Sequence, residues 1–101
     1  MPTVIVRYET KPERADENQK LVEQVFASLA QEAPAGLRYA TFRLGDGVSF
    51  VHIASVETAD GSNPLAALPA FAEFQAEIVD RCAVQPAVRD ATLVGSYRFF
   101  A

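Results

Sequence analysis

The side chain best suited to proton transfer is His52, which is the sole histidine of the sequence. Its ordinary pKa lies near neutrality, so it exchanges protons readily at physiological pH. Tyr8 and Tyr97 offer phenolic hydroxyls, while Phe50 and Phe71 offer flat apolar surface. A histidine and two phenols in an apolar pocket can orient a phenolic ligand and remove its proton. The resulting anion is electron-rich enough to react with oxygen without metal or flavin.

The face of the sheet that carries His52 depends on the hairpin around Gly45-Asp46-Gly47. A three-residue loop pairs Leu44 with Val48 and turns His52 toward a cavity between sheet and helices, whereas a two-residue turn pairs Leu44 with Ser49. The first register groups His52 with Ala40, Phe42 and Phe50, and the second groups it with Thr41 and Arg43 at an interface. We expect the first register. Even there, a histidine satisfied by a tyrosine hydroxyl inside the core is the alternative to a catalytic base.

Three arginines form a second group with chemical potential. Arg7, Arg43 and Arg98 could bind an anion, because guanidinium groups suit carboxylates and phosphates. The alternative is that they pair with Glu9 and with acidic residues across a dimer interface. We expect the second arrangement, and therefore place Arg7, Glu9, Arg43 and Arg98 at that interface.

Composition excludes several other kinds of site. Cys82 is the only cysteine, so no internal disulfide or cysteine-based metal site is expected, which suits a reducing compartment. No metal-ligand spacing or phosphate-binding loop is present, so we expect neither metal nor cofactor. A net charge of −4 offers no positive field for nucleic acid or anionic membrane. The start Met1-Pro2-Thr3 does not resemble a secretory signal, and no run approaches about 20 apolar residues, so a cytoplasmic protein is expected.

The elements that must position these residues follow from hydrophobic periodicity and from breaking residues. We predict strands over 3–9, 37–44, 48–56 and 91–100, and a helix over 14–33 with a capping box of Asp16 and Gln19. Asn63 and Pro64 start a short turn, and Pro69 restarts a helix that carries Phe71, Phe74, Ile78 and Cys82 on one side.

The order strand, helix, strand, strand, helix, strand predicts a single α+β domain over 1–101 of the ferredoxin-like βαββαβ class. Short connections favour a four-stranded antiparallel sheet in the order 4-1-3-2 with two helices on one face. Alternation places Val4, Val6 and Tyr8 toward the helices, and Thr3, Ile5, Arg7 and Glu9 on the uncovered face. That face is too apolar for water and too charged for a dry core, so we expect a homodimer.

Several stretches resemble the antibiotic biosynthesis monooxygenase-like family of dimeric α/β barrels. They are the opening Thr3-Val4-Ile5-Val6 strand ending at Lys11-Pro12, and the strand from Phe50 to Thr58 leading to Ala70-Phe71-Ala72-Glu73-Phe74. The resemblance implies two sheets packed face to face, a pocket between each sheet and its helices, and activities such as cofactor-independent oxygenation of phenols or quinols.

Two hypotheses follow. The first is a homodimeric, cofactor-independent monooxygenase-like protein that acts on a small phenol or quinol, with His52 as the base and Tyr8, Phe50, Phe71 and Tyr97 in the pocket. The second is a non-catalytic dimeric module that binds a small hydrophobic ligand or has a structural role. Val56 and Ala70 favour the second, since many active members of the family carry an aromatic residue and a histidine there.

Overall fold

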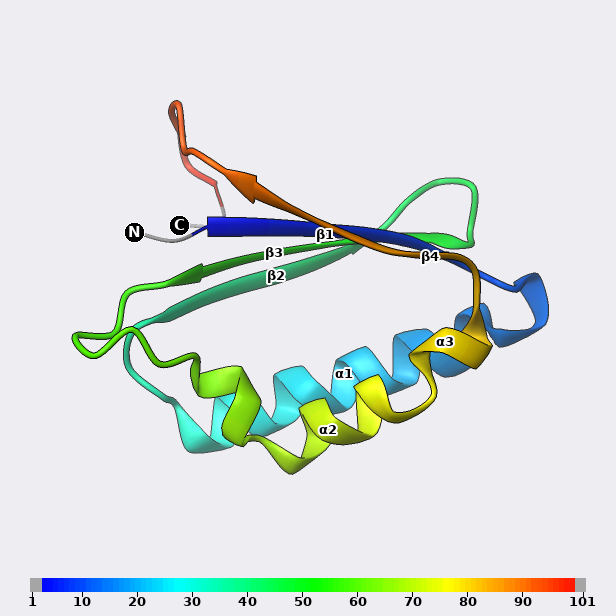
Figure 1. The fold of residues 1–101 in the computed structure, drawn as a ribbon, viewed down its shortest axis with the longest axis horizontal. Helices are drawn as coiled ribbons and strands as arrows, with labels where there is room; N and C mark the ends of the chain where they lie inside the picture. The colour runs from blue at the N-terminus through cyan, green and yellow to red at the C-terminus, as the bar shows by residue number, and fades with distance from the viewer. Residues whose placement is uncertain (1–2, 100–101) are drawn as a thin grey trace.

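This computed structural model describes residues 3–99 of the chain. They contain a four-stranded antiparallel sheet that helices cover on one face (Figure 1). The strands are β1 (Thr3–Thr10), β2 (Leu37–Arg43), β3 (Ser49–Val56) and β4 (Cys82–Ala91). The helices are α1 (Ala15–Glu32), α2 (Pro69–Ala76) and the single turn α3 (Ile78–Arg81), with 3-10 turns at Pro12–Arg14 and Pro64–Ala67. The strand order β2-β3-β1-β4 confirms the ferredoxin-like class.

Strand β1 divides its side chains between the two faces as its alternation predicts. Val4, Val6 and Tyr8 point toward the helices, and Tyr8 is only 2% exposed. The other set, with Ile5 and Arg7, lies on the face that no helix covers, because successive side chains of a strand point to opposite sides. The central position of β1, between β3 and β4, therefore brings Tyr8 into the middle of the core.

Helix α1 packs its apolar stripe under the sheet, with Val22 and Val25 buried. It ends at Ala33, whose φ is 44° and whose N–H donates to the carbonyl of Leu29 at 2.8 Å. The predicted capping box does not form, because Arg14 occupies the capping position and makes no side-chain cap. The short turn before α2 does form as predicted, with Asn63 Oδ1 accepting from the N–H of Leu65 at 3.0 Å.

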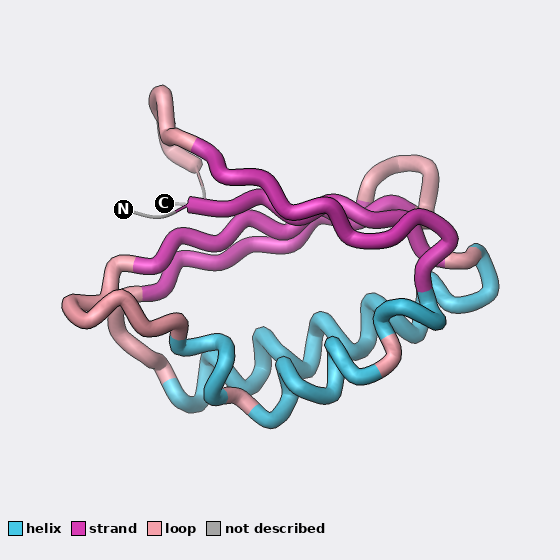
Figure 2. The backbone as a smooth tube through the Cα atoms, in the orientation of Figure 1, coloured by secondary structure: helices cyan, strands magenta, loops and turns pink. Residues whose placement is uncertain are grey.

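The last strand differs from the prediction. It is Cys82–Ala91, so the predicted strand over 91–100 is wrong, and the second helix ends before Cys82. Pro86 lies within β4, an edge strand, at the point where the register with β1 shifts between Arg7 and Glu9, and proline is tolerated at edges and bulges because the regular ladder is interrupted there. Residues 92–99 follow as a tail without helix or strand on the far side of the sheet from the helices (Figure 2). Phe100 lies outside the described residues.

The hairpin between β2 and β3 adopts the register that was not expected. Thr41 pairs with His52, and the N–H of Leu44 donates to the carbonyl of Ser49 at 2.9 Å. The carboxylate of Asp46 explains the choice, since it accepts from the N–H groups of Val48 and Ser49 at 3.0 and 2.8 Å. These bonds hold Val48 within the loop and start the ladder at Ser49.

Candidate functional site

A cavity of about 290 Å³ lies between the sheet and α2. Its wall includes the ring side chains Tyr8, Tyr39, His52, Phe71 and Phe74. A second hollow of about 350 Å³ lies beside the end of α1, where Tyr39 is the only lining residue with a titratable side chain. We place the site in the first cavity, because it alone of the two contains His52.

His52 is 5% exposed and has an oxygen close to each ring nitrogen. The Tyr8 hydroxyl lies 2.7 Å from Nε2. The hydroxyls of Tyr39 and Thr41 lie 2.6 and 3.0 Å from Nδ1. Register explains this arrangement, since β3 places His52 between Val6 of β1 and Thr41 of β2.

The contacts continue from Tyr8 into the helical layer. Asn18 Nδ2 donates to the Tyr8 hydroxyl oxygen at 2.9 Å, and Arg81 Nε donates to Asn18 Oδ1 at 3.0 Å. Asn18 and Arg81 are both 0% exposed. We call the series Arg81, Asn18, Tyr8, His52 and Tyr39 the buried polar chain. It joins α3, α1, β1, β3 and β2, so every layer of the fold contributes to holding the histidine.

Burial lowers the pKa of His52 to about 4. The imidazole is therefore neutral at physiological pH, with one nitrogen that donates and one that accepts. Burial also raises the pKa of Tyr8 and of Tyr39 above the ordinary value for a phenol. All three groups are uncharged at pH 7, so the cavity presents hydrogen bonds rather than charges to a ligand.

The predicted pocket residues divide into three kinds. Tyr8 and Phe71 line the cavity with His52. Phe50 is 1% exposed and stacks on Tyr8 with ring centroids 5.6 Å apart, so it supports the tyrosine from within the core. Tyr97 is 83% exposed in the tail and does not reach the cavity, because the last strand ends before it.

Although the expected register is wrong, the expectation that His52 faces the cavity holds. Tyr39 and Thr41 lie on the helix-facing side of β2 with His52, rather than on an interface. The prediction was wrong because it assigned Thr41 and Arg43 of β2 to the uncovered face of the sheet. Arg43 follows the same alternation, so it also lies on the helix-facing side.

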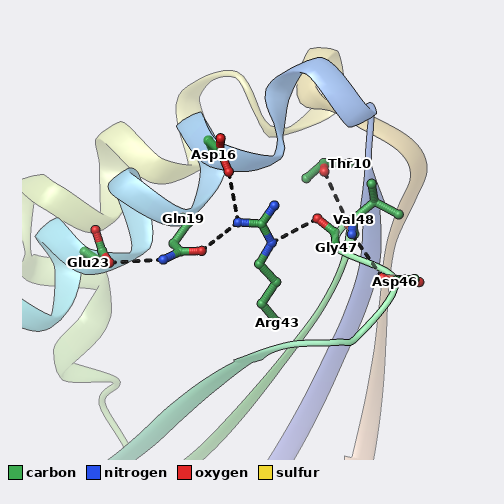
Figure 3. A network of polar contacts seen from close by, with 8 residues as sticks. All are labelled: Thr10, Asp16, Gln19, Glu23, Arg43, Asp46, Gly47 and Val48. Carbon is green, nitrogen blue, oxygen red and sulfur yellow. Dashed lines mark hydrogen bonds and ion pairs between the residues drawn. The ribbon is translucent and has the colours of Figure 1, made fainter.

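Arg43 is thus held within its own chain instead of lying with Arg7 on the uncovered face. Its Nη1 donates to Asp16 Oδ1 at 3.0 Å and to Gln19 Oε1 at 2.7 Å, and its Nε donates to the Gly47 carbonyl at 2.9 Å (Figure 3). Asp16 and Gln19 are the two side chains that were expected to form the capping box of α1. Arg43 therefore fastens the hairpin to the start of the helix.

The other proposed interface residues lie apart from the cavity. Alternation along β1 places Arg7 and Glu9 on the face opposite to Tyr8, away from the helices. Arg98 lies in the tail, with its guanidinium 5.3 Å from the centre of the Tyr97 ring. Arg43 lies on the other face of the sheet from Arg7, so the three arginines do not form one anion site.

Sequence reasoning missed Asn18, Tyr39 and Arg81. A signal for two of them was present, since each is a polar residue within an apolar helical stripe. Asn18 precedes Val22 by four positions, and Arg81 follows Phe74 by seven. A polar side chain at such a position must find a buried partner. Tyr39 carried no such signal, because its face depended on the hairpin register.

No group of three or more His, Cys, Asp or Glu side chains that could hold a metal occurs among residues 3–99. In the same range, no helix has the length and apolar character needed to cross a bilayer.

The strand order, the single helical layer and the cavity between them define a ferredoxin-like protein with a monooxygenase-like fold. The chain is similar to a solved structure described as an antibiotic biosynthesis monooxygenase, with a TM-score of 0.75, 23% identity, and coverage of 94% of this chain and 100% of the other. It is also similar to Rv0793 from Mycobacterium tuberculosis, with a TM-score of 0.74, 17% identity, and coverage of 94% and 96%.

A third similar structure is that of SnoaB, a cofactor-independent oxygenase from Streptomyces nogalater, with a TM-score of 0.64, 18% identity, and coverage of 96% of each chain. No family model and no curated protein sequence matches the chain. At these identities the likeness establishes the fold. The resemblance found in the sequence is therefore confirmed at the level of the fold.

Proposed function

We propose that this protein binds a small phenolic or quinol compound in the cavity and oxygenates it without a bound cofactor. The observation that carries the proposal is the pair formed by Tyr39 and His52 at the wall of a cavity that is otherwise largely aromatic and apolar. An apolar cavity of about 150 Å³ holds benzene. The volume of about 290 Å³ here suits a compound of one or two rings.

The proposed reaction needs no external reductant. A phenol with a free para position and O₂ become a quinone and water: one oxygen atom forms the new carbonyl and the other leaves as water. The substrate supplies all four electrons. One ring C–H bond at the para position and the phenolic O–H bond are lost, and both hydrogens end in the water. Several cofactor-free steps of this kind begin when a base withdraws the phenolic proton and makes the ring electron-rich.

His52 is the proposed proton acceptor in that step, through Nε2, and the Tyr8 hydroxyl 2.7 Å away in the cavity wall would pass on the proton of the substrate hydroxyl. Its pKa of about 4 is about 6 units below that of an ordinary phenol, a gap on the order of 8 kcal/mol. The oxygenase function therefore requires the bound substrate to have a much lower pKa than a simple phenol, as an extended quinol with an adjacent carbonyl does.

The same observation favours a second candidate, a binding module without catalysis. Both nitrogens of His52 already have protein partners, as a structural histidine would. In this case the cavity holds an aromatic ligand, and the buried polar chain only orients it.

Oxygen consumption with one- and two-ring phenols and quinols separates the two candidates. The oxygenase predicts uptake of one O₂ per quinone formed, which His52→Gln abolishes and Tyr97→Phe leaves unchanged. Ligand binding measured by calorimetry, with no uptake above the uncatalysed rate, would support the module. Absence of both binding and uptake would end both proposals.

We further propose that two copies of the chain pair through the uncovered face of the sheet. Arg7 on this face carries charge beside Ile5, Val51 and Ile53, which are only partly shielded by their neighbours. The tail on the same side exposes several large apolar side chains, namely Leu93 at 73%, Val94 at 98%, Tyr97 at 83% and Phe99 at 58%. Such a concentration of apolar surface favours a protein partner over water.

Sedimentation equilibrium of the full chain over a range of dilutions tests this pairing. We expect a dimer at micromolar concentration that dissociates as salt rises, if Arg7 and Glu9 pair across the interface. A single-chain mass at every concentration would contradict the homodimer and with it the barrel formed by two sheets.

A further inference from the structure

At the Arg81 end of the buried polar chain, the direction of hydrogen bonding is fixed. The guanidinium of Arg81 carries only donors, so its Nε must donate to Asn18 Oδ1, 3.0 Å away. The oxygen of the Asn18 amide therefore points to Arg81, and its nitrogen points to Tyr8. Asn18 Nδ2 donates to the Tyr8 hydroxyl oxygen at 2.9 Å.

This direction passes from Asn18 to the histidine. Because the Tyr8 oxygen accepts from Asn18, its own hydrogen is available for His52 Nε2 at 2.7 Å. Nε2 then accepts, and a neutral imidazole whose Nε2 accepts must carry its hydrogen on Nδ1. That hydrogen is directed to the Tyr39 oxygen at 2.6 Å, with the Thr41 oxygen at 3.0 Å.

We propose that Arg81, acting through Asn18 and Tyr8, holds His52 as the tautomer protonated on Nδ1, and thereby makes the Tyr39 hydroxyl a hydrogen-bond donor to an acceptor oxygen of a cavity ligand. Arg81 and Asn18 are positioning residues, and Tyr39 is the residue that meets the ligand. The statement about the ligand rests on the proposed function, whereas the statement about the tautomer does not.

The burial of Arg81 supports this role. Its side chain is 0% exposed, and no ion pair within residues 3–99 includes it. Its partners are the Asn18 oxygen, the Phe74 carbonyl at 2.5 Å and the face of the Phe74 ring at 5.3 Å. A buried charge without a carboxylate is costly, and an apolar side chain would serve stability at least as well. The guanidinium of Arg81 can only donate, so it fixes the direction of every hydrogen bond from Asn18 to His52.

Nitrogen NMR of the wild-type protein tests the tautomer directly. His52 is the sole histidine, so labelling with ¹⁵N-histidine reports on this ring alone. At pH 7 we expect Nδ1 to show the shift of a protonated nitrogen and Nε2 that of an unprotonated one. Protonation on Nε2, or an even mixture of the two forms, would overturn the proposal without any variant being needed.

Asn18→Asp should reverse the tautomer. The introduced carboxylate accepts from Arg81 with one oxygen and from the Tyr8 hydroxyl with the other, so the Tyr8 oxygen must then accept from His52 Nε2–H. Gln24→Glu makes the same amide-to-carboxylate change on the exposed face of α1 and should leave the ring unchanged. A folded Asn18→Asp protein, judged by circular dichroism, that keeps the wild-type pattern would contradict the role of Asn18.

Binding of 1-tetralone and tetralin tests the role of Tyr39, because these two-ring compounds differ in one carbonyl oxygen. Tyr39→Phe should weaken binding of 1-tetralone about three- to tenfold and leave that of tetralin unchanged, as expected for one hydrogen bond. Equal effects on both would overturn the donor role. If neither compound binds, the aromatic-ligand function and the donor role fail together, while the tautomer result stands.

Discussion

At His52 two physical effects act in the same direction. Burial lowers its pKa to about 4, and the hydroxyls of Tyr8 and Tyr39 occupy its two nitrogens. A charged imidazole would need both of these oxygens to accept. The Tyr8 oxygen would then accept from both Asn18 and His52, and the Tyr8 hydrogen would lose its acceptor. The site is thus arranged for a neutral histidine of one tautomer.

Because the native pKa of about 4 lies below the ordinary value of 6.5, the unfolded chain takes up a proton before the folded one. The stabilisation is fully present above pH 6.5 and is lost as the pH falls toward 4, by about 3 kcal/mol in the free energy of unfolding. Urea denaturation of wild type and His52→Gln between pH 7 and 4 isolates this contribution, because carboxylates affect both proteins alike. If the free energy of unfolding fell equally with pH in the two proteins, the contribution of His52 would be contradicted.

The three tyrosines provide a graded test of the buried polar chain. Tyr8→Phe leaves the Asn18 amide and His52 Nε2 without their shared partner and should lower the free energy of unfolding by about 2 kcal/mol. Tyr39→Phe should cost less, since Thr41 remains beside Nδ1. Tyr97→Phe should change it by less than about 0.5 kcal/mol, because this residue is exposed. Equal losses at Tyr8 and Tyr97 in urea denaturation would rule out the buried chain as drawn.

Among the elements, the β2–β3 hairpin has the largest influence on the site. Its register places His52 opposite Thr41, and Asp46 stabilises the loop that produces this register. Arg43 then fastens the same hairpin to α1 through Asp16 and Gln19. The position of the histidine therefore depends on a loop that does not touch the cavity.

Two glycines of this loop offer a matched pair. Gly47 has a φ of +80°, whereas Gly45 does not adopt a positive φ, and an added Cβ would meet nothing within 4 Å at either position. Gly47→Ala should therefore destabilise the protein by about 1 kcal/mol through backbone strain alone. Gly45→Ala should be neutral or slightly stabilising. Thermal unfolding that gives the reverse order would show that the loop is held differently.

On the scale of the whole molecule, the two faces of the sheet have separate roles. One face meets the helices, and the other bears the tail (Figure 1). The cavity lies on the first face, and alternation places the side chains of Ile5 and Arg7 on the second. A two-layer domain with one uncovered apolar face is incomplete by itself. The proposed pairing of two copies would cover that face.

The tail is the part of the molecule best suited to test the pairing. Val94→Asp places a charge on a side chain that is 98% exposed in the single chain, so it should not disturb folding. If the tail packs on a second copy, the dimer dissociation constant should rise at least about tenfold. Val79→Asp, at a position that is 66% exposed on α3, serves as the control in sedimentation equilibrium. Equal dissociation constants for the two variants would remove the tail from the interface.

Local periodicity in the sequence was sufficient to predict the order of the elements and the inward face of β1, and rules for short connections then predicted the strand order. It also grouped Tyr8 with Phe71, whereas His52 was grouped with them through a hairpin register that is wrong. These features depend on spacing between near neighbours, which is visible along the chain. The alternation of Val4, Val6 and Tyr8 and the stripe through Val22 and Val25 are of this kind.

Contacts between distant segments decided the rest, and no local pattern reports them. Pro86 reads as a break until β4 is known to be an edge strand with a register shift at that point, where a proline is tolerated. Asn18 and Arg81 lie 63 positions apart in the chain, so only the packing of the helices brings them together. The sequence by itself determined which apolar side chains of the first strand and helix face the core. The tertiary structure decided how the buried polar groups are paired, because each pairing requires several elements to be in place at once.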